Sequence, residues 1–230
     1  YNVLADGTVD GFGPDDVDVV KEIHHVLRDD PPDAAAIRRS MGHDPIVQEF
    51  VRYDDEFMFT GLYDRGEPLA TFQHRQIRGN SYTGGGGVYR RSTYEPELER
   101  VGRALLAELD WHGLACIEYM RDAETGEYVL TEINPRMWQS LPSTVRAGAD
   151  YPYYYWLAAT GRADEIDCVY ELGVGTHMLH GELGYLTSVL TEESPHVERP
   201  SIPGTVWEIA SSTAREPRFD YLTLDDPGPF

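Results

Sequence analysis

Residues 113–136, GLACIEYMRDAETGEYVLTEINPR, are the part of the sequence that most restricts the fold, because their pattern predicts a β-hairpin. Apolar and β-branched residues fill both arms, and residues 123–127 form a five-residue loop with glycine where a positive φ is needed. The expected cross-strand pairs under this loop are Asp122 with Tyr128, Met120 with Leu130, and Glu118 with Glu132.

The two opposed glutamates indicate a cation site. Directly opposed side chains on one sheet face have Cβ atoms about 4.5–5.5 Å apart, and like charges there are destabilising. Because side chains alternate along a strand, Asn134 shares the face of Glu132, and Arg136 would share it if the strand continued past Pro135. Oxygen ligands without His or Cys suit Mg²⁺ or Ca²⁺ rather than zinc. An arginine beside them suggests phosphate or a developing oxyanion.

Three other interpretations of the hairpin are open. The two glutamates could face solvent, with Asn-Pro as an ordinary strand terminator. If Thr125 and Gly126 alone formed the turn, Glu118 would oppose Ile133 and the acids would lie on opposite faces. The pair could also act as acid and base in a hydrolase, but such carboxylates usually flank a cleft from two sides, about 5–10 Å apart. Adjacent strand positions suit a shared metal better.

The charge of the chain excludes several classes of partner. Its 230 residues contain 40 Asp and Glu against 19 Lys and Arg, a formal charge of −21, so nucleic acids and anionic membranes are poor partners. Lys21 is the only lysine. Such a composition resembles that of proteins from salt-loving organisms, where high ionic strength screens self-repulsion. We therefore hypothesise a halophilic protein.

Cysteine content and hydropathy predict a cytoplasmic protein. Cys116 and Cys168 are too few for a disulfide framework or a zinc site, which fits a reducing compartment. No apolar run approaches the roughly 20 residues of a membrane span, and no signal peptide opens the sequence.

The remaining sequence predicts alternating helices and strands. The glycine run 84–87 reads as a flexible loop or as backbone that approaches phosphates. His177 and His180 lack a third metal ligand and are expected to be structural. The expected elements are helices over residues 14–27, 33–41, 96–109, 140–148, 151–160 and 180–190, a buried strand over 46–51, and a hairpin over 56–77 with its turn at 64–67.

The runs GLACIEYM and YVLTEINPR, followed by AGADYP, resemble the metal-binding core of the ATP-grasp superfamily, most of all its carbamoyl-phosphate synthase type. The resemblance covers roughly residues 46–160. It implies an α+β ATP-grasp fold, with an antiparallel sheet and flanking helices. It also implies that Glu118, Glu132 and Asn134 bind Mg²⁺, or Mn²⁺, on the phosphates of ATP, and that Arg136 steadies an acyl-phosphate or its transition state.

The same resemblance assigns further residues upstream. IVQEFVRYDDEF is similar to the hinge strand of the superfamily, so Glu49 and Val51 would meet adenine and Glu56 the ribose. Backbone groups of an extended strand can pair with adenine, and a carboxylate can accept both ribose hydroxyls. Arg75 and Arg78 resemble the basic strand that faces the triphosphate and the second substrate, and their alternative is an exposed basic face.

The resemblance divides the chain into three parts: residues 1–50 as the remainder of a small nucleotide lobe, 51–160 as the catalytic lobe, and 161–230 as an extension packed on that lobe. ATP-grasp enzymes hold the phosphates with two lysines of the small lobe, and Lys21 falls after the loop where one is expected. We therefore expect the N-terminal part of the fold to lie outside this sequence.

The expected activity is that of an ATP-dependent ligase. A substrate carboxylate would be phosphorylated to an acyl-phosphate, which an amine or a thiol then attacks. The partners would be small-molecule carboxylates and amines, and a homodimer is compatible with the resemblance. The alternative is a nucleotide-binding domain that has the fold without turnover, as the missing lysines would permit.

Overall fold

The computed structural model describes residues 2–4, 17–19, 31–42, 44, 46–194 and 197–222. The chain forms two compact units, Tyr1–Phe50 and Val51–Phe230, and each is described by itself. None of the helices in the described ranges is both long enough and apolar enough to cross a membrane.

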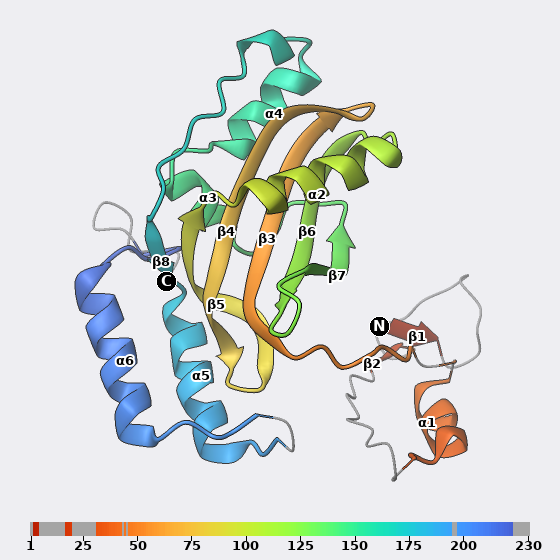
Figure 1. Ribbon diagram of the computed structural model, residues 1–230, viewed down its shortest axis with the longest axis vertical. Helices are drawn as coiled ribbons and strands as arrows, with labels where there is room; N and C mark the ends of the chain where they lie inside the picture. The colour runs from red at the N-terminus through yellow and green to blue at the C-terminus, as the bar shows by residue number, and fades with distance from the viewer. Residues whose placement is uncertain are drawn as a thin grey trace. The chain divides into compact units, whose positions relative to one another are not determined.

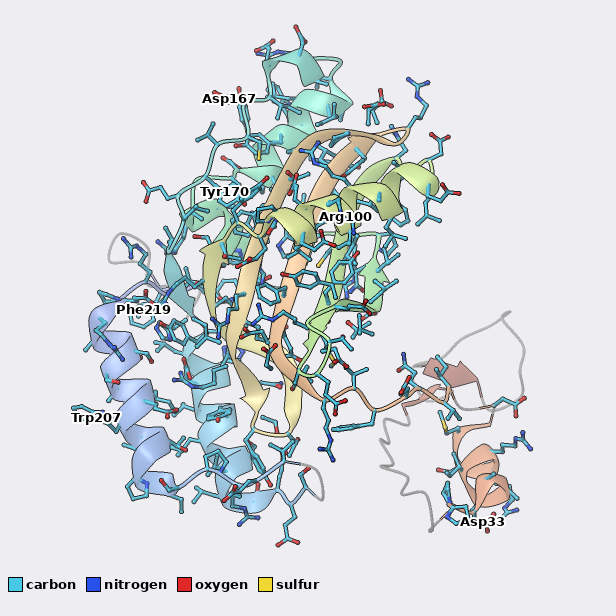
Figure 2. The ribbon with its side chains drawn as sticks, in the orientation of Figure 1. Asp33, Arg100, Asp167, Tyr170, Trp207 and Phe219 are labelled. Carbon is cyan, nitrogen blue, oxygen red and sulfur yellow. The ribbon has the colours of Figure 1, made fainter. Side chains whose placement is uncertain are left out.

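The first unit contains two short strands and one helix. β1 (Asn2–Leu4) pairs antiparallel with β2 (Val17–Val19), and α1 spans Ala34–Met41. Asp33 lies at the start of α1 (Figure 2). It caps this helix, because its carboxylate accepts hydrogen bonds from two backbone amides of the first turn. The helix expected over residues 14–27 is wrong at β2, where the Val-Asp-Val alternation suits a strand. The rest of that range, Lys21 included, lies outside the described residues.

The expected buried strand over residues 46–51 is also wrong. This segment is not a strand, and Ile46 and Val47 are 71% and 86% exposed. Apolar residues form a buried strand only where a neighbouring strand pairs with their backbone. Pairing begins later in the chain, at Tyr53.

The second unit is built on a six-stranded antiparallel sheet with the order β7-β6-β3-β4-β5-β8 (Figure 1). The strands are β3 (Tyr53–Asp64), β4 (Glu67–Ser81), β5 (Gly84–Thr93), β6 (Gly113–Asp122), β7 (Tyr128–Asn134) and β8 (Gly175–His177). The expected α+β architecture, an antiparallel sheet with flanking helices, is confirmed.

Two hydrophobic clusters cover opposite faces of this sheet. α2 (Pro96–Glu108) packs Leu98 and Leu106 against Phe57 and Phe59 of β3. On the other face, residues around α3 (Leu141–Arg146) and α4 (Tyr151–Ala159) pack against Leu62, Phe72 and Cys116. The alternation of side chains along β3 separates the two clusters. The three expected helices of this region are confirmed.

The β3–β4 hairpin turns where the sequence predicts it. Arg65 and Gly66 both have positive φ, 47° and 80°, and Asp64 pairs with Glu67. Such a two-residue turn matches the twist of the strands. The glycine run is not a loop, because Gly84 to Gly87 form the first half of β5 and pair with the end of β4. Glycine lowers strand propensity but does not prevent pairing next to a short turn.

The β6–β7 hairpin has the expected loop over residues 123–127, with Gly126 at φ 73°. Glu118 pairs with Glu132 and Cys116 with Asn134, so the central prediction is confirmed. The other two predicted pairs are wrong by one residue, since Tyr119 pairs with Leu130. A β-bulge at Thr131 causes the shift.

The C-terminal part adds a short 3-10 helix (Ala163–Glu165), β8 and two helices, α5 (Leu179–Thr191) and α6 (Ile202–Arg215). α5 contacts β4 and β5, and α6 lies beside α5 (Figure 1). The helix expected near residues 180–190 is confirmed, whereas α6 was not predicted. Its sequence, IPGTVWEIASSTAR, is rich in residues typical of turns, but Ser201 caps its N-terminus.

Candidate metal and nucleotide site

A pocket of about 390 Å³ lies on the sheet face that carries the opposed glutamates. Its walls come from β3, β4, β5, β6 and β7 and from the segment after β7. Glu56, Glu118, Glu132, Asn134 and Arg136 all line it. The structure therefore brings five of the nine predicted site residues together.

The hairpin register places three oxygen-bearing side chains side by side. Glu118 and Glu132 are direct cross-strand partners, and Asn134 is two residues beyond Glu132 on the same strand. The bulged residue Thr131 donates its hydroxyl hydrogen bond to the backbone carbonyl of Glu118 at 2.9 Å. This bond holds the two strands together beside the glutamate pair.

The carboxylates of the pocket repel one another. Burial raises the pKa of Glu118, the opposed Glu132 raises it further, and Arg136 lowers it. Burial and the charge of Glu118 raise the pKa of Glu56 to about 7, against a smaller lowering by a hydrogen bond from Tyr53. Gln76 also donates a hydrogen bond to Glu56. A bound cation would relieve this repulsion.

Arg136 places a positive charge beside the predicted metal ligands. Its Nη2 donates to Oδ1 of Asn134 at 3.1 Å, and its Nη1 donates to the carbonyl of Met137 at 3.1 Å. Asn134 is 7% exposed, so this contact orients a buried amide. The predicted Asn-Pro-Arg arrangement therefore exists as a local contact, with Arg136 reaching back to the end of β7.

The donor set fits a hard divalent cation. Two carboxylates and one amide oxygen are the ligand types that Mg²⁺ takes, with water and phosphate completing its shell. Across the described part of the chain, no three His, Cys, Asp or Glu side chains are grouped so that they could hold a metal ion by themselves.

The two arginines predicted to face the triphosphate lie elsewhere. Arg75 is paired with Asp55 at 2.5 Å, and Arg78 makes a buried ion pair with Glu182 at 2.7 Å. Neither belongs to the lining of this pocket among the described residues. A register shift between Gln76 and Arg78 turns Arg78 away from the side of Gln76.

The adenine-binding prediction remains untested. Glu49 is exposed and belongs to the first unit, whereas Val51 begins the second unit and precedes β3. Glu56, the predicted ribose ligand, lines the pocket near Glu118.

The polar residues of the pocket that sequence reasoning missed include His74, Gln76 and Arg90. His74 is directly across from Met58 on β3, and Gln76 is across from Glu56 and Arg90. Their common face follows from alternation once β4 and β5 are paired. Sequence reasoning did not recognise this shared face, because the glycine run suggested a loop in place of β5.

No protein-family model matches the sequence, and no curated protein matches it. Solved structures match part of the chain. The phosphoribosylaminoimidazole carboxylase ATPase subunit from Aquifex aeolicus is 21% identical with a TM-score of 0.45, over 56% of this chain and 40% of its own. The N5-carboxyaminoimidazole synthetase from Staphylococcus aureus, complexed with ADP, is 14% identical with a TM-score of 0.42, over 56% of this chain and 35% of its own.

A third match is the biotin carboxylase domain of the Hydrogenobacter thermophilus 2-oxoglutarate carboxylase, in complex with MgADP and bicarbonate. It is 14% identical with a TM-score of 0.41, over 60% of this chain and 31% of its own. The chain spans well under half the length of each of these three chains. Each of the three matches covers a little more than half of this chain.

Proposed function

We propose that the pocket binds Mg-ATP and that the chain carries the metal-binding part of an ATP-dependent ligase. The observation that carries this proposal is the cross-strand pairing of Glu118 with Glu132, with Asn134 next on the same face. Opposed carboxylates cost stability in a sheet, and a shared cation between them offsets that cost.

Each of the five predicted residues that line the pocket has a proposed role. Glu118, Glu132 and Asn134 would hold Mg²⁺, or Mn²⁺, which supplies positive charge at the transferring phosphoryl group. Arg136 would orient Asn134 and add a fixed charge beside the acyl-phosphate. Glu56, steadied by Gln76, would accept hydrogen bonds from the ribose.

The proposed chemistry needs no nucleophile from the protein. An oxygen of a substrate carboxylate would attack the terminal phosphorus of ATP and release ADP. An amine or a thiol would then attack the acyl carbon and release phosphate. The pocket residues contribute position and charge, which are the main sources of rate enhancement in phosphoryl transfer.

Calorimetric titration with Mg-ADP tests the metal assignment. We expect binding that requires Mg²⁺ and that weakens about tenfold or more in Glu132→Gln, because one ligand becomes neutral. Glu127→Gln, in the exposed loop of the same hairpin, is the matched control and should bind as the parent chain does. Equal binding with and without Mg²⁺, or in Glu132→Gln, would exclude the metal site.

A second candidate function is nucleotide binding without turnover. The observation that favours it is the presence of a single lysine, Lys21, where the resemblance implies two phosphate-binding lysines. Phosphate release from Mg-ATP in the presence of carboxylate and amine mixtures separates the two candidates. Mg-dependent nucleotide binding with no phosphate release would favour the binding domain.

A further inference from the structure

A second pocket, of about 440 Å³, lies where β4 and β5 meet α5 and α6. Three arginines, Arg78, Arg91 and Arg215, line it together with Tyr89 and Tyr185. Two glutamates, Glu208 and Glu216, complete its charged residues. Positive and negative side chains balance here once Glu182, which pairs with Arg78 behind the lining, is included, in a chain whose formal charge is −21.

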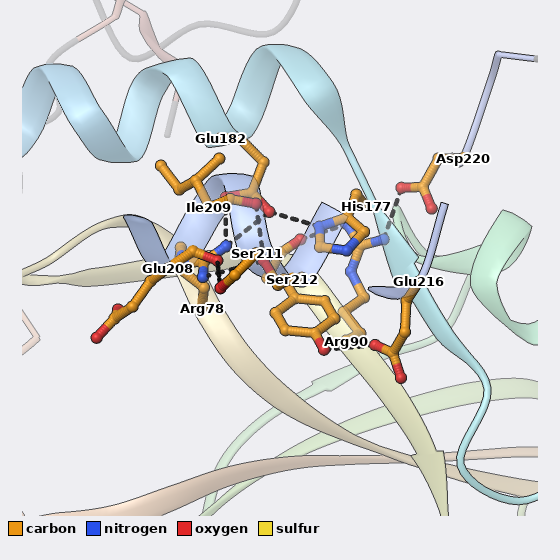
Figure 3. A network of polar contacts seen from close by, with 12 residues as sticks. Arg78, Arg90, His177, Glu182, Glu208, Ile209, Ser211, Ser212, Glu216 and Asp220 are labelled. Carbon is orange, nitrogen blue, oxygen red and sulfur yellow. Dashed lines mark hydrogen bonds and ion pairs between the residues drawn. The ribbon is translucent and has the colours of Figure 1, made fainter. Parts of the chain in front are cut away.

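Behind the lining residue Arg78 lies a polar network with Glu182 and His177 (Figure 3). Arg78 donates from Nη1 to both carboxylate oxygens of Glu182, at 2.8 and 2.7 Å, and Nδ1 of His177 lies 2.7 Å from Oε1 of Glu182. All three side chains are buried. The Arg78 guanidinium also lies 5.4 and 5.6 Å from the ring centres of Tyr89 and Tyr185. These contacts hold the wall in place without leaving Arg78 free for a ligand.

The outer arginines have donors to spare. Arg91 uses Nε and Nη2 on Glu216 and the Tyr89 hydroxyl, and Arg215 uses Nε and Nη2 on Ser211. Within the part of the chain that the structure describes, Nη1 of Arg91, Nη1 of Arg215 and the Tyr185 hydroxyl have no hydrogen-bond partner.

The carboxylates of the lining leave these donors unused. Glu216 is occupied by the Tyr89 hydroxyl and by Arg91 at 2.9 Å. The side chain of Glu208 points away from the Arg78–Glu182 pair (Figure 3) and makes no hydrogen bond with Arg91, Arg215 or Tyr185 within the described part of the chain. Burial raises the pKa of Tyr185, Arg78 lowers it, and the nearby charge of Glu208 raises it, so a bound anion would have Glu208 as a neighbour. A ligand with its own negative charge is thus the group that the free donors lack.

We propose that this pocket binds a small organic anion. Its carboxylate or phosphate would accept hydrogen bonds from Arg91, Arg215 and the Tyr185 hydroxyl, since guanidinium groups present paired donors that match both anions. Its apolar part would lie against the Tyr185 ring and Ile77, which is 39% exposed.

This site is separate from the proposed nucleotide site. Arg90 lines the first pocket, whereas its neighbours Tyr89 and Arg91 on β5 line the second. Side chains alternate along a strand, so the two pockets lie on opposite sides of β5. The proposal therefore goes beyond the proposed ligase activity and does not depend on it.

Calorimetric titration of the chain with benzoate and with phenyl phosphate tests the proposal. We expect at least one of them to bind, and the one with the higher affinity shows whether the pocket prefers a carboxylate or a phosphate. Benzyl alcohol and inorganic phosphate should bind at least tenfold more weakly. Arg215→Gln and Arg91→Gln should each weaken binding about tenfold, and Tyr185→Phe should weaken it severalfold. Arg100→Gln, on the exposed surface of α2, is the control and should bind like the parent chain.

Three results would overturn the proposal: no binding of either aryl anion at millimolar concentration, binding that is unchanged in both arginine variants, or binding that is lost in Glu132→Gln. The last result would place the anion in the first pocket. Thermal melts show whether each variant folds. If an arginine variant does not fold, the weaker binding expected of Tyr185→Phe still tests the proposal. If Mg-ADP fails to bind while benzoate binds, the proposed function alone is excluded.

Discussion

His74 shows how a single buried side chain sets the acid stability of the sheet. It lies in the middle of β4, is 1% exposed, and its Nδ1 has no hydrogen-bond partner among the described residues. Burial lowers the pKa of His74 to about 3, and the charge of Arg90 contributes to that lowering. The imidazole is therefore neutral in the folded chain at neutral pH.

This pKa predicts a loss of stability in acid. A histidine with a lower pKa in the folded state than in the unfolded state binds fewer protons when folded, so the free energy of unfolding falls as the pH drops below about 6.5. The loss attributable to His74 should reach about 2 kcal/mol between pH 6.5 and 5. Urea unfolding at the two pH values measures it.

His74→Phe should remove this part of the pH dependence, because phenylalanine keeps the ring and does not titrate. His180→Gln removes an exposed histidine and serves as the control. If His74→Phe loses as much stability as the parent chain between pH 6.5 and 5, then His74 takes up a proton in the folded state as readily as in the unfolded state.

At the scale of elements, Gly102 determines how closely α2 approaches the sheet. A Cβ atom at this position would lie 2.7 Å from Cγ and Cδ1 of Phe59, which is fully buried on β3. Helix propensity alone would favour alanine by about 1 kcal/mol. We expect Gly102→Ala nevertheless to destabilise the protein by about 1–3 kcal/mol, because the added methyl overpacks the core. Thermal or urea unfolding checks the sign.

Ala104→Gly is the matched control for this prediction, because Ala104 is on the exposed side of the same helix. It should cost only the propensity difference, about 1 kcal/mol. A Gly102→Ala variant more stable than the parent chain would mean that α2 can move away from Phe59 without loss.

The hairpin shows what a sequence can predict about an element and what it cannot. The loop over residues 123–127 and the period-two alternation together predict that Glu118 faces Glu132, and both follow from local chemistry. The bulge at Thr131 depends on how the backbones of two strands meet, so the pairs nearer the loop were displaced by one residue.

A bulge also explains why Arg78 does not line the first pocket. Simple alternation from His74 and Gln76 would place Arg78 on the same face, but the register shift after Gln76 sends it to Glu182 instead. Arg90 was missed for a related reason, since its face is known only once Gly84–Thr93 is recognised as a strand. Because glycine has a low strand propensity, the sequence does not predict that strand. Pairing with β4 stabilises it instead.

At the scale of the whole molecule, buried ion pairs tie distant parts of the second unit together. Arg90 of β5 and Asp220, near the end of the described chain, are 2.6 Å apart and almost fully buried. Asp220→Asn would leave the Arg90 charge without its partner, so we expect a loss of about 3–5 kcal/mol in the free energy of unfolding. Urea unfolding of this variant measures the loss.

Glu124→Gln makes the same chemical change at an exposed loop position and should have little effect. Because Arg90 also lines the first pocket, Asp220→Asn should weaken Mg-ADP binding as well, provided that the proposed function is right. A stability close to that of the parent chain would show that Arg90 finds water or another partner once Asp220 is neutral.

The excess of acidic residues predicts how the whole molecule responds to salt. A formal charge of −21 on 230 residues repels itself in the compact state, and mobile ions screen that repulsion over about 10 Å at 0.1 M and about 3 Å at 1 M. The melting temperature should therefore rise by several degrees between 0.05 and 1 M KCl, most steeply at the low end.

Replacing exposed acids such as Glu124, Glu127 and Asp164 by their amides should make the rise smaller, since less repulsion remains to be screened. The same molar range of sucrose, which carries no charge, separates screening from solute exclusion. A melting temperature that does not change with KCl would contradict the halophilic hypothesis.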